Sequence, residues 1–264
     1  MPVQLPVDVH GFAGRALQLD RLDASLAATA DEPTAVLISA VSGTAGVGKT
    51  ALAVRWAHHV RDRFPDGQLY LNLRGFDPGG RVLDPAEALS TFLDALGVPA
   101  EGMPVGLDAL AGLYRSLVAG RRMLFLLDNA RDADQVRPLL PGTATAAVVV
   151  TSRNQLVSLA AGAGAQAVTV DALSAAESRD LLGRRLGARV VAAEPAAVDR
   201  IITACAGLPL ALTIAAARAR QTRPSLTTLA DELAAAGNCL DVLELLARTS
   251  HAAATGFDRH TPAI

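Results

Sequence analysis

Residues 43–50 read GTAGVGKT and match the pattern G-x-x-x-x-G-K-[ST]. In loops of this kind the glycines let the backbone curl, so that its N–H groups point inward at phosphate oxygens. We expect Lys49 to reach the outer phosphates and the Thr50 hydroxyl to bind Mg²⁺. The pattern therefore predicts a nucleoside-triphosphate site whose loop contacts come from Gly43, Gly46, Val47, Gly48, Lys49, Thr50 and Ala51.

The chain uses lysine only once. Of its 24 Lys and Arg residues, Lys49 is the single lysine, which leaves 24 − 1 = 23 arginines. An ammonium group acts on phosphate as a compact point charge, a role that a planar guanidinium fills poorly. The single lysine also excludes a GTPase of the N-K-x-D type, because that motif needs a second one.

Two apolar runs end in polar residues that suit a phosphate site. The run Met123–Leu127 leads into Asp128, and a carboxylate beside Thr50 would hold Mg²⁺ through its water shell. Asn129 follows where many ATPases carry a second acid, so we expect hydrolysis to be slow or absent. The run Val148–Val150 leads to Arg153, which at the carboxyl edge of a parallel sheet would read the terminal phosphate.

An alternative uses part of the same loop. Gly46–Ala51 also fits the dinucleotide fingerprint G-x-G-x-x-[GA], which would make the protein an oxidoreductase. That fold needs an acidic residue at the end of the second strand to hold the ribose, and the chain has Asn72 and Arg74 there. It also leaves Lys49 without a role.

The elements that position these residues alternate between strands and helices. Apolar runs of strand length alternate with helical periodicity, which predicts an α/β fold of the P-loop NTPase type, a three-layer parallel sheet followed by a small helical subdomain. Leu19, Leu22 and Leu26 predict a helix within 15–30. Capping patterns begin helices at Asp84 and Ser174. The expected strands are Ala35–Val41, Leu69–Leu73, Met123–Leu127, Ala146–Val150 and Ala167–Val170, and the expected parts are a linker (1–14), the nucleotide-binding domain (15–172), the helical lid (173–248) and a tail (249–264).

Composition narrows the function classes. A net charge of −2 and a pI near 6.2 disfavour DNA binding by this chain alone. The sequence has no signal-peptide pattern and no stretch approaching ~18 apolar residues. Cys205 and Cys239 lie among apolar neighbours, so we interpret them as core thiols in a reducing cytoplasm, and we interpret His58 and His59 as scaffold.

Four motifs in this order resemble a known family. The phosphate loop, LFLLDN (Leu124–Asn129), VVVTSR (Val148–Arg153) and GLPLAL (Gly207–Leu212) are similar to the NB-ARC branch of the STAND P-loop NTPases. LYLNLRGFDP and LLDNARDADQVRPLLPG make the chain most similar to the nucleotide-binding region of actinobacterial SARP-type transcriptional regulators. The resemblance covers roughly residues 5 to 245.

The resemblance implies further contacts and a function. Phe12 and Arg15 would contact the adenine and ribose, although the family usually has an acid where this chain has Ala16, and Pro209 would close on the base. Such proteins are ATP/ADP switches that regulate transcription, including that of antibiotic biosynthesis. Self-association and DNA contact are then expected through attached modules outside this chain. The alternative that the residues leave open is a turnover ATPase or small-molecule kinase, and a vestigial site is the third reading.

Overall fold

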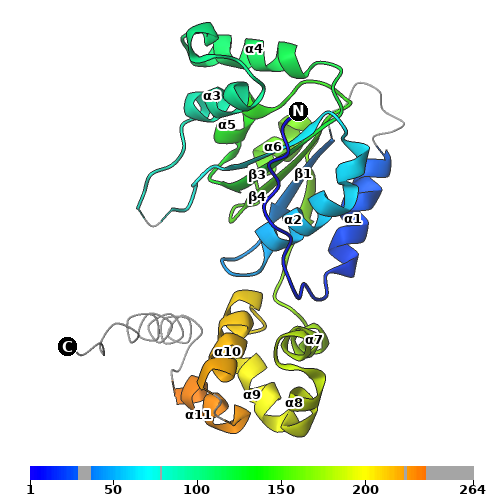
Figure 1. The fold of residues 1–264 in the computed structure, drawn as a ribbon, viewed down its shortest axis with the longest axis vertical. Coiled ribbons are helices and arrows are strands. Elements are labelled where there is room, and N and C mark those ends of the chain that lie inside the picture. Colours follow the sequence, from blue (N-terminus) through cyan, green and yellow to red (C-terminus); the bar gives the residue numbers. More distant parts are fainter. Residues whose placement is uncertain (29–36, 78, 223–224, 236–264) are drawn as a thin grey trace, which may run out of the picture. The chain divides into compact units, whose positions relative to one another are not determined.

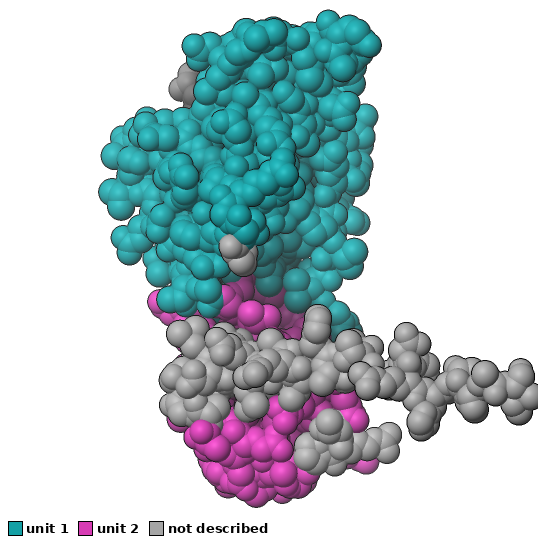
Figure 2. Space-filling view, turned by 90° about the vertical axis from the view of Figure 1, so that its left-hand side faces the viewer, with its two compact units in different colours: residues 1–10, 15–45, 49–170 teal, residues 11–14, 46–48, 171–264 magenta. Residues whose placement is uncertain are grey.

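The computed structural model describes residues 1–28, 37–77, 79–222 and 225–235. These residues form two compact units, drawn in teal and magenta in Figure 2. Unit 1 comprises residues 1–10, 15–45 and 49–170, and unit 2 comprises residues 11–14, 46–48 and the chain from 171 onward. Cys239 and the predicted tail, 249–264, lie outside the described residues.

Five strands form one parallel sheet in unit 1, in the order β2-β3-β4-β1-β5. The interior strands β3 and β4 are rich in Leu and Val and are buried almost throughout, as expected when helices cover both faces of a parallel sheet. The predicted α/β sheet is confirmed. The strands are β1 (Leu37–Ser42), β2 (Gly67–Asn72), β3 (Met123–Ala130), β4 (Ala147–Ser152) and β5 (Gln166–Thr169).

This strand order excludes the dinucleotide alternative. In the dinucleotide-binding fold the second strand lies directly beside the first, so that its terminal acid reaches the ribose. Here β1 pairs with β4 and β5, and both β3 and β4 lie between β1 and β2. The end of β2 is therefore separated by two intervening strands from the loop that follows β1.

Helices cover both faces of the sheet (Figure 1). On one face α1 and α2 bury Leu22, Leu26 and Trp56. On the other face one large apolar cluster joins the sheet to the remaining helices of this unit. In it Phe92 stacks on Tyr114, and Phe125 meets both rings edge-on, at centroid distances of 5.8–5.9 Å. The helices of unit 1 are α1 (Ala16–Ala28), α2 (Lys49–Val60), α3 (Pro85–Ala95), α4 (Leu107–Val118), α5 (Ala133–Val136) and α6 (Val157–Ala163), with short 3₁₀ turns at Arg61–Arg63, Ala100–Gly102 and Arg137–Leu139.

The first residues of the chain are bound to unit 1. Val3 forms a parallel bridge with Gln68 of β2, an edge strand of the sheet. Further on, the Pro6 carbonyl lies 2.7 Å from Nε2 of His58, and Asp8 pairs with Arg55. Part of the segment that the sequence predicted as a linker thus lies along the β2 edge and α2.

Unit 2 is helical in its described part. The capping box predicted at Ser174 is present: the Glu177 N–H donates to the Ser174 hydroxyl, and the Glu177 carboxylate accepts from the Ser174 N–H. The predicted core position of Cys205 is confirmed, because it is buried in the apolar cluster of this unit. The helices are α7 (Ala175–Leu186), α8 (Ala188–Ala193), α9 (Pro195–Ala204), α10 (Pro209–Thr222) and α11 (Leu226–Ala235).

None of the helices in the part of the chain that the structure describes has the length and apolar character that a membrane crossing requires.

Candidate functional site

The phosphate-loop pattern lies between β1 and α2. β1 ends at Ser42, and α2 begins at Lys49, the motif lysine. Gly46 and Gly48 have φ angles of 75° and 95°, a region that residues with a side chain rarely adopt. Nζ of Lys49 donates to the carbonyl oxygens of Gly43 and Thr44, each at 2.8 Å. The ammonium group therefore lies inside the curve of the loop, at the amino end of a helix, where anions are stabilised.

Asp128 meets three hydroxyl groups at the carboxyl edge of the sheet. Its Oδ1 accepts hydrogen bonds from Thr50 Oγ1 at 2.6 Å and from Thr151 Oγ1, and its Oδ2 lies 3.4 Å from the Tyr70 hydroxyl. The Asp128 residue is only 5% exposed, so these donors keep a buried carboxylate hydrogen-bonded. A carboxylate and the Thr50 hydroxyl are oxygen ligands that suit Mg²⁺, directly or through water.

Burial and neighbouring charges shift two pKa values at the site. Burial lowers the pKa of Lys49, the positive charge of Arg153 lowers it further, and Asp128 partly opposes both. Burial raises the pKa of Tyr70 to about 12, with the charge and hydrogen bond of Asp128 adding to the effect. Tyr70 therefore stays protonated and donates to Asp128. Lys49 and Arg153 are two cations close enough to repel each other, an arrangement that a bound polyanion would stabilise.

Strand β3 does not end at Asp128, where its apolar run stops. It continues to Ala130, with an irregular register against β4 between Leu127 and Ala130. Asn129 has a φ of 58°, and its N–H donates to Thr151 Oγ1 at 2.9 Å. A bulge of this kind redirects side chains at a strand end, and here it coincides with Asp128.

Arg153 lies just beyond β4 and contacts an aromatic ring. Its guanidinium carbon is 4.9 Å from the centroid of Phe76, which belongs to the β2–α3 loop, described at residues 73–77 and 79–84. A guanidinium over a ring face is attracted by the negative charge of the π system. Arg153 is thus held near the carboxyl edge by a loop from a different strand.

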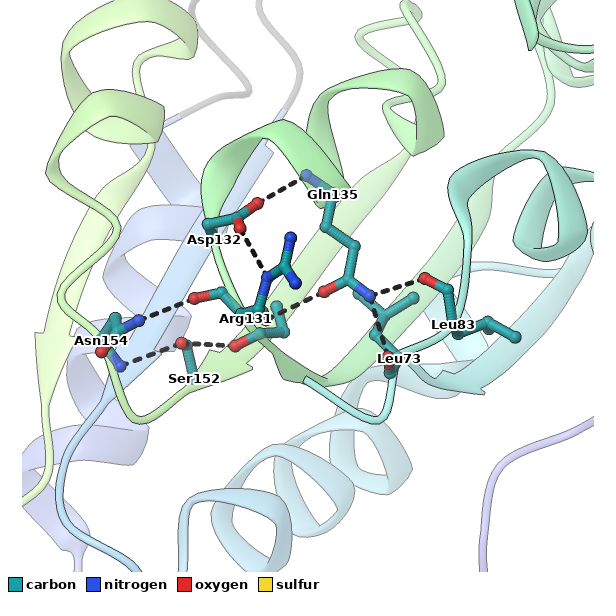
Figure 3. A network of polar contacts seen from close by, with 8 residues as sticks. Leu73, Leu83, Arg131, Asp132, Gln135, Ser152 and Asn154 are labelled. Carbon is teal, nitrogen blue, oxygen red and sulfur yellow. Dashed lines mark hydrogen bonds and ion pairs between the residues drawn. The ribbon is translucent and has the colours of Figure 1, made fainter. Parts of the chain in front are cut away.

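The turn between β3 and α5 joins these loops (Figure 3). Gln135 is 4% exposed; its Nε2 donates to the carbonyls of Leu73 and Leu83, and its Oε1 accepts from the N–H of Arg131, all at 2.9 Å. On the other side, Asn154 Nδ2 donates to the Arg131 carbonyl at 2.7 Å. One buried amide therefore ties the β2–α3 loop to the turn that also holds the segment around Arg153.

Comparisons with known proteins show what the chain is similar to. The chain is 46% identical over 244 residues to the Regulatory protein AfsR of Streptomyces griseus. The aligned region covers 92% of this chain and 24% of that protein. The chain spans about a quarter of the length of the curated AfsR relatives that it matches. No protein-family model matches it.

Solved structures share the fold at low sequence identity. A Walker-type ATPase of Pyrococcus abyssi has a TM-score of 0.55 and 14% identity, over 94% of this chain and 79% of the other. A STAND protein of Pyrococcus horikoshii with a tetratricopeptide repeat sensor has a TM-score of 0.51 and 19% identity, over 80% of this chain and 31% of the other. This chain is an NB-ARC-like P-loop domain. The predicted resemblance to the region found in SARP-type regulators is confirmed.

The remaining predicted contacts of the NB-ARC-like domain fall in different parts of the chain. Phe12 belongs to the short segment of unit 2 that contributes Ala13 to its apolar core. Arg15, in unit 1, is 5% exposed and has a φ of 69°. Pro209 is the first residue of α10, and its Cγ lies 3.6 Å from the position that a Cβ on Gly48 would take. Gly48 and Pro209 both belong to unit 2.

Motif reasoning missed three side chains of the NB-ARC-like domain that act on this edge. Tyr70 contacts Asp128, Phe76 contacts Arg153, and Gln135 joins two loops. Tyr70 could have been found from strand pairing, because Asn72 lies opposite Asp128 and Tyr70 is on the same face, two residues earlier. Phe76 and Gln135 lie within the motifs LYLNLRGFDP and LLDNARDADQVRPLLPG, but nothing in those motifs assigns a role to either side chain.

Proposed function

We propose that this domain binds ATP and ADP with Mg²⁺ and acts as a regulatory nucleotide switch in a transcriptional regulator. The observation that carries the proposal is the 2.6 Å hydrogen bond between Thr50 Oγ1 and Asp128 Oδ1. It joins the phosphate loop to the end of β3, so that both oxygen donors face one place beside Lys49. The name of the AfsR relatives, a regulatory protein, supports the regulatory part.

Each residue of the proposed site has a chemical role. The loop from Gly43 to Ala51 surrounds the phosphates, and Lys49 neutralises their charge. Thr50 and Asp128 hold Mg²⁺, which neutralises phosphate charge when bound. Arg153 contacts the outermost phosphate. From the family resemblance, Phe12, Arg15 and Pro209 contact the adenine and ribose. We assign DNA contact and nucleotide-dependent self-association to attached modules. We expect the protein to act in the cytoplasm.

The identity of the residue after Asp128 favours slow ATP hydrolysis. A second acid at that position would orient the attacking water in an ATPase, whereas the amide of Asn129 cannot accept a proton at neutral pH. Its backbone is held by the bond to Thr151. We therefore expect the domain to retain bound ATP for long times instead of turning it over as an enzyme does.

Calorimetry and mass spectrometry test this proposal. The purified chain is titrated with ATP, ADP and adenosine, each with and without Mg²⁺, and nucleotide released on denaturation is identified by mass. ATP and ADP should bind, and each should raise the free energy of unfolding by about 2.7 kcal/mol at 100 times its Kd. Phosphate release should stay far below a typical enzyme rate of about 10 s⁻¹. Failure of both nucleotides to bind at millimolar concentration would contradict the proposal.

A further inference from the structure

Arg153 is held by two different groups of contacts. Its backbone neighbours are fixed to the end of β3: Ser152 Oγ donates to the Ala130 carbonyl at 2.6 Å, and Asn154 Nδ2 donates to the Arg131 carbonyl. These contacts fix where the Arg153 backbone lies. They do not fix where its long, exposed side chain points.

Phe76 supplies the second group of contacts. Its ring lies under the Arg153 guanidinium at 4.9 Å. The loop that carries Phe76 is seated closely on the β3 end, because a Cβ at Gly75 would lie 2.3 Å from the Arg131 nitrogen and 2.6 Å from the Asn129 oxygen. The Gly75 N–H also donates to the Asn129 carbonyl at 2.7 Å. The backbone that carries the ring is therefore fixed relative to Asp128 and Asn129.

Gln135 fixes the same loop at both of its ends. Its buried amide bonds to the carbonyls of Leu73 and Leu83, which lie on either side of Phe76 in the chain, and to the N–H of Arg131 (Figure 3). Asp132 in turn accepts from the Gln135 N–H at 2.9 Å. These bonds place the loop relative to the β3–α5 turn, and the bond from Asn154 places Arg153 relative to the same turn.

We propose that Phe76 is a positioning residue that holds the Arg153 guanidinium toward the outermost phosphate of the nucleotide, and that Gln135 acts through it by fixing the β2–α3 loop. This inference rests on the proposed function, since it assigns Arg153 to that phosphate. A long arginine side chain loses much rotational freedom on binding, and a stacked ring removes part of that cost before the ligand arrives. Phe76 should therefore strengthen the binding of ATP more than the binding of ADP.

The test measures the ratio of the ADP Kd to the ATP Kd by calorimetry. Phe76→Leu keeps apolar bulk but removes the π face, and should lower this ratio about two- to fivefold, the range of an exposed cation–π contact. Phe76→Tyr keeps the ring and should retain the wild-type ratio. Phe64→Leu is the matched control, because Phe64 is a buried ring at the opposite end of β2, and its ratio should not change.

A double-mutant cycle separates positioning from general destabilisation. If Phe76 acts through Arg153, then Phe76→Leu should have no effect on the ratio once Arg153→Ala is present. Gln135→Met, which keeps the side-chain length without its hydrogen bonds, should lower the melting temperature and reproduce the ratio shift of Phe76→Leu. A ratio unchanged or raised by Phe76→Leu, or lowered equally in the Arg153→Ala background, would overturn the inference. If the wild-type chain bound neither ATP nor ADP, that result would instead overturn the proposed function.

Discussion

The carboxyl edge of the sheet in unit 1 and the corner between α9 and α10 in unit 2 hold their loops by different means. At the sheet edge, polar side chains such as Gln135 and Asp128 bond to segments far away in sequence. At the helical corner, Gly207 with a φ of 64° lets the chain turn, and its carbonyl accepts from the Leu173 N–H at 2.9 Å. The sheet edge therefore depends on polar bonds between distant segments, whereas the corner depends on the backbone conformation of one glycine and the close packing around it.

This comparison predicts opposite responses to mutation. Removing a polar group that faces the proposed ligand, such as Lys49, should change ligand binding while unit 1 stays folded. Adding a methyl group at the helical corner should lower the stability of unit 2, because no space is left there. The following experiments test the contrast, beginning with the largest expected effect.

Lys49→Ala should weaken the binding of both ADP and ATP by about ten- to a hundredfold, the range for losing a hydrogen bond to a charged group. The melting temperature without nucleotide should hardly change, because Lys49 donates only to carbonyls of its own loop. Calorimetry and circular dichroism measure the two quantities. Arg55→Ala is the matched control, since it removes another cation from α2, one that pairs with Asp8. Unchanged affinities in Lys49→Ala would remove the phosphate-site assignment.

Gly207→Ala should destabilise unit 2 by about 1–3 kcal/mol, the cost of forcing a residue with a side chain into a strained backbone region. The added Cβ would also lie 2.5 Å from the Leu173 carbonyl oxygen. Gly183→Ala, inside α7 with open space around it, should instead stabilise by about 0.5–1 kcal/mol. Urea unfolding of both variants measures the difference. Equal effects of the two substitutions would show that the corner does not need its glycine.

The sequence predicted the elements that carry this contrast better than the contacts between them. The five strands, the capping box at Ser174 and the order of the motifs follow from local periodicity and spacing, because each depends on residues within one segment. The contact of Phe76 with Arg153 and the bonds of Gln135 depend on how the loops of neighbouring strands meet. Such long-range pairs have no local pattern, so sequence reasoning could not find them.

The end of β3 shows the same limit on a smaller scale. The change from apolar residues to Asp128 predicted that the strand would end there, whereas it continues to Ala130 through an irregular register. Backbone bonds from Leu73 and Gly75 to the carbonyls of Asp128 and Asn129 extend the pairing. These partners lie on the β2–α3 loop, and so the extension depends on the tertiary structure.

Asp128→Asn should weaken Mg²⁺-dependent ATP binding about tenfold, at the lower end of the range for outer-sphere partners of a metal. Binding of ADP with a chelator present should change little, because the proposed role of the carboxylate acts through the metal. Asp134→Asn is the control, since this exposed aspartate pairs with Arg137 at the surface. Calorimetry with Mg²⁺ and with a chelator gives both affinities. Equal losses under the two conditions would make Asp128 a structural residue only.

Asp132→Ala should have the smallest effect, about 1 kcal/mol of unfolding free energy at pH 7, typical of a lost helix cap. Asp132 caps α5 by accepting from the Gln135 N–H. That hydrogen bond and the one from Arg131 lower the pKa of Asp132. Because the folded pKa lies below the unfolded value of about 3.9, the charge-dependent stabilisation is complete above the unfolded value and disappears as the pH falls through the folded one.

The pH series for Asp132 therefore distinguishes its cap from its charge. Asp132→Asn keeps an oxygen that can cap the helix but carries no charge, so it should cost less than Asp132→Ala at pH 7 and approach the wild type in acid. Denaturant unfolding between pH 7 and pH 3 measures this. A difference between wild type and Asp132→Asn that grows as the pH falls would contradict the assigned hydrogen bonds. Since Asp132 also bonds to the residue that fixes the β2–α3 loop, its loss should shift the ratio of the ADP Kd to the ATP Kd in the same direction as Gln135→Met, by a smaller factor, because the Gln135 side-chain bonds remain.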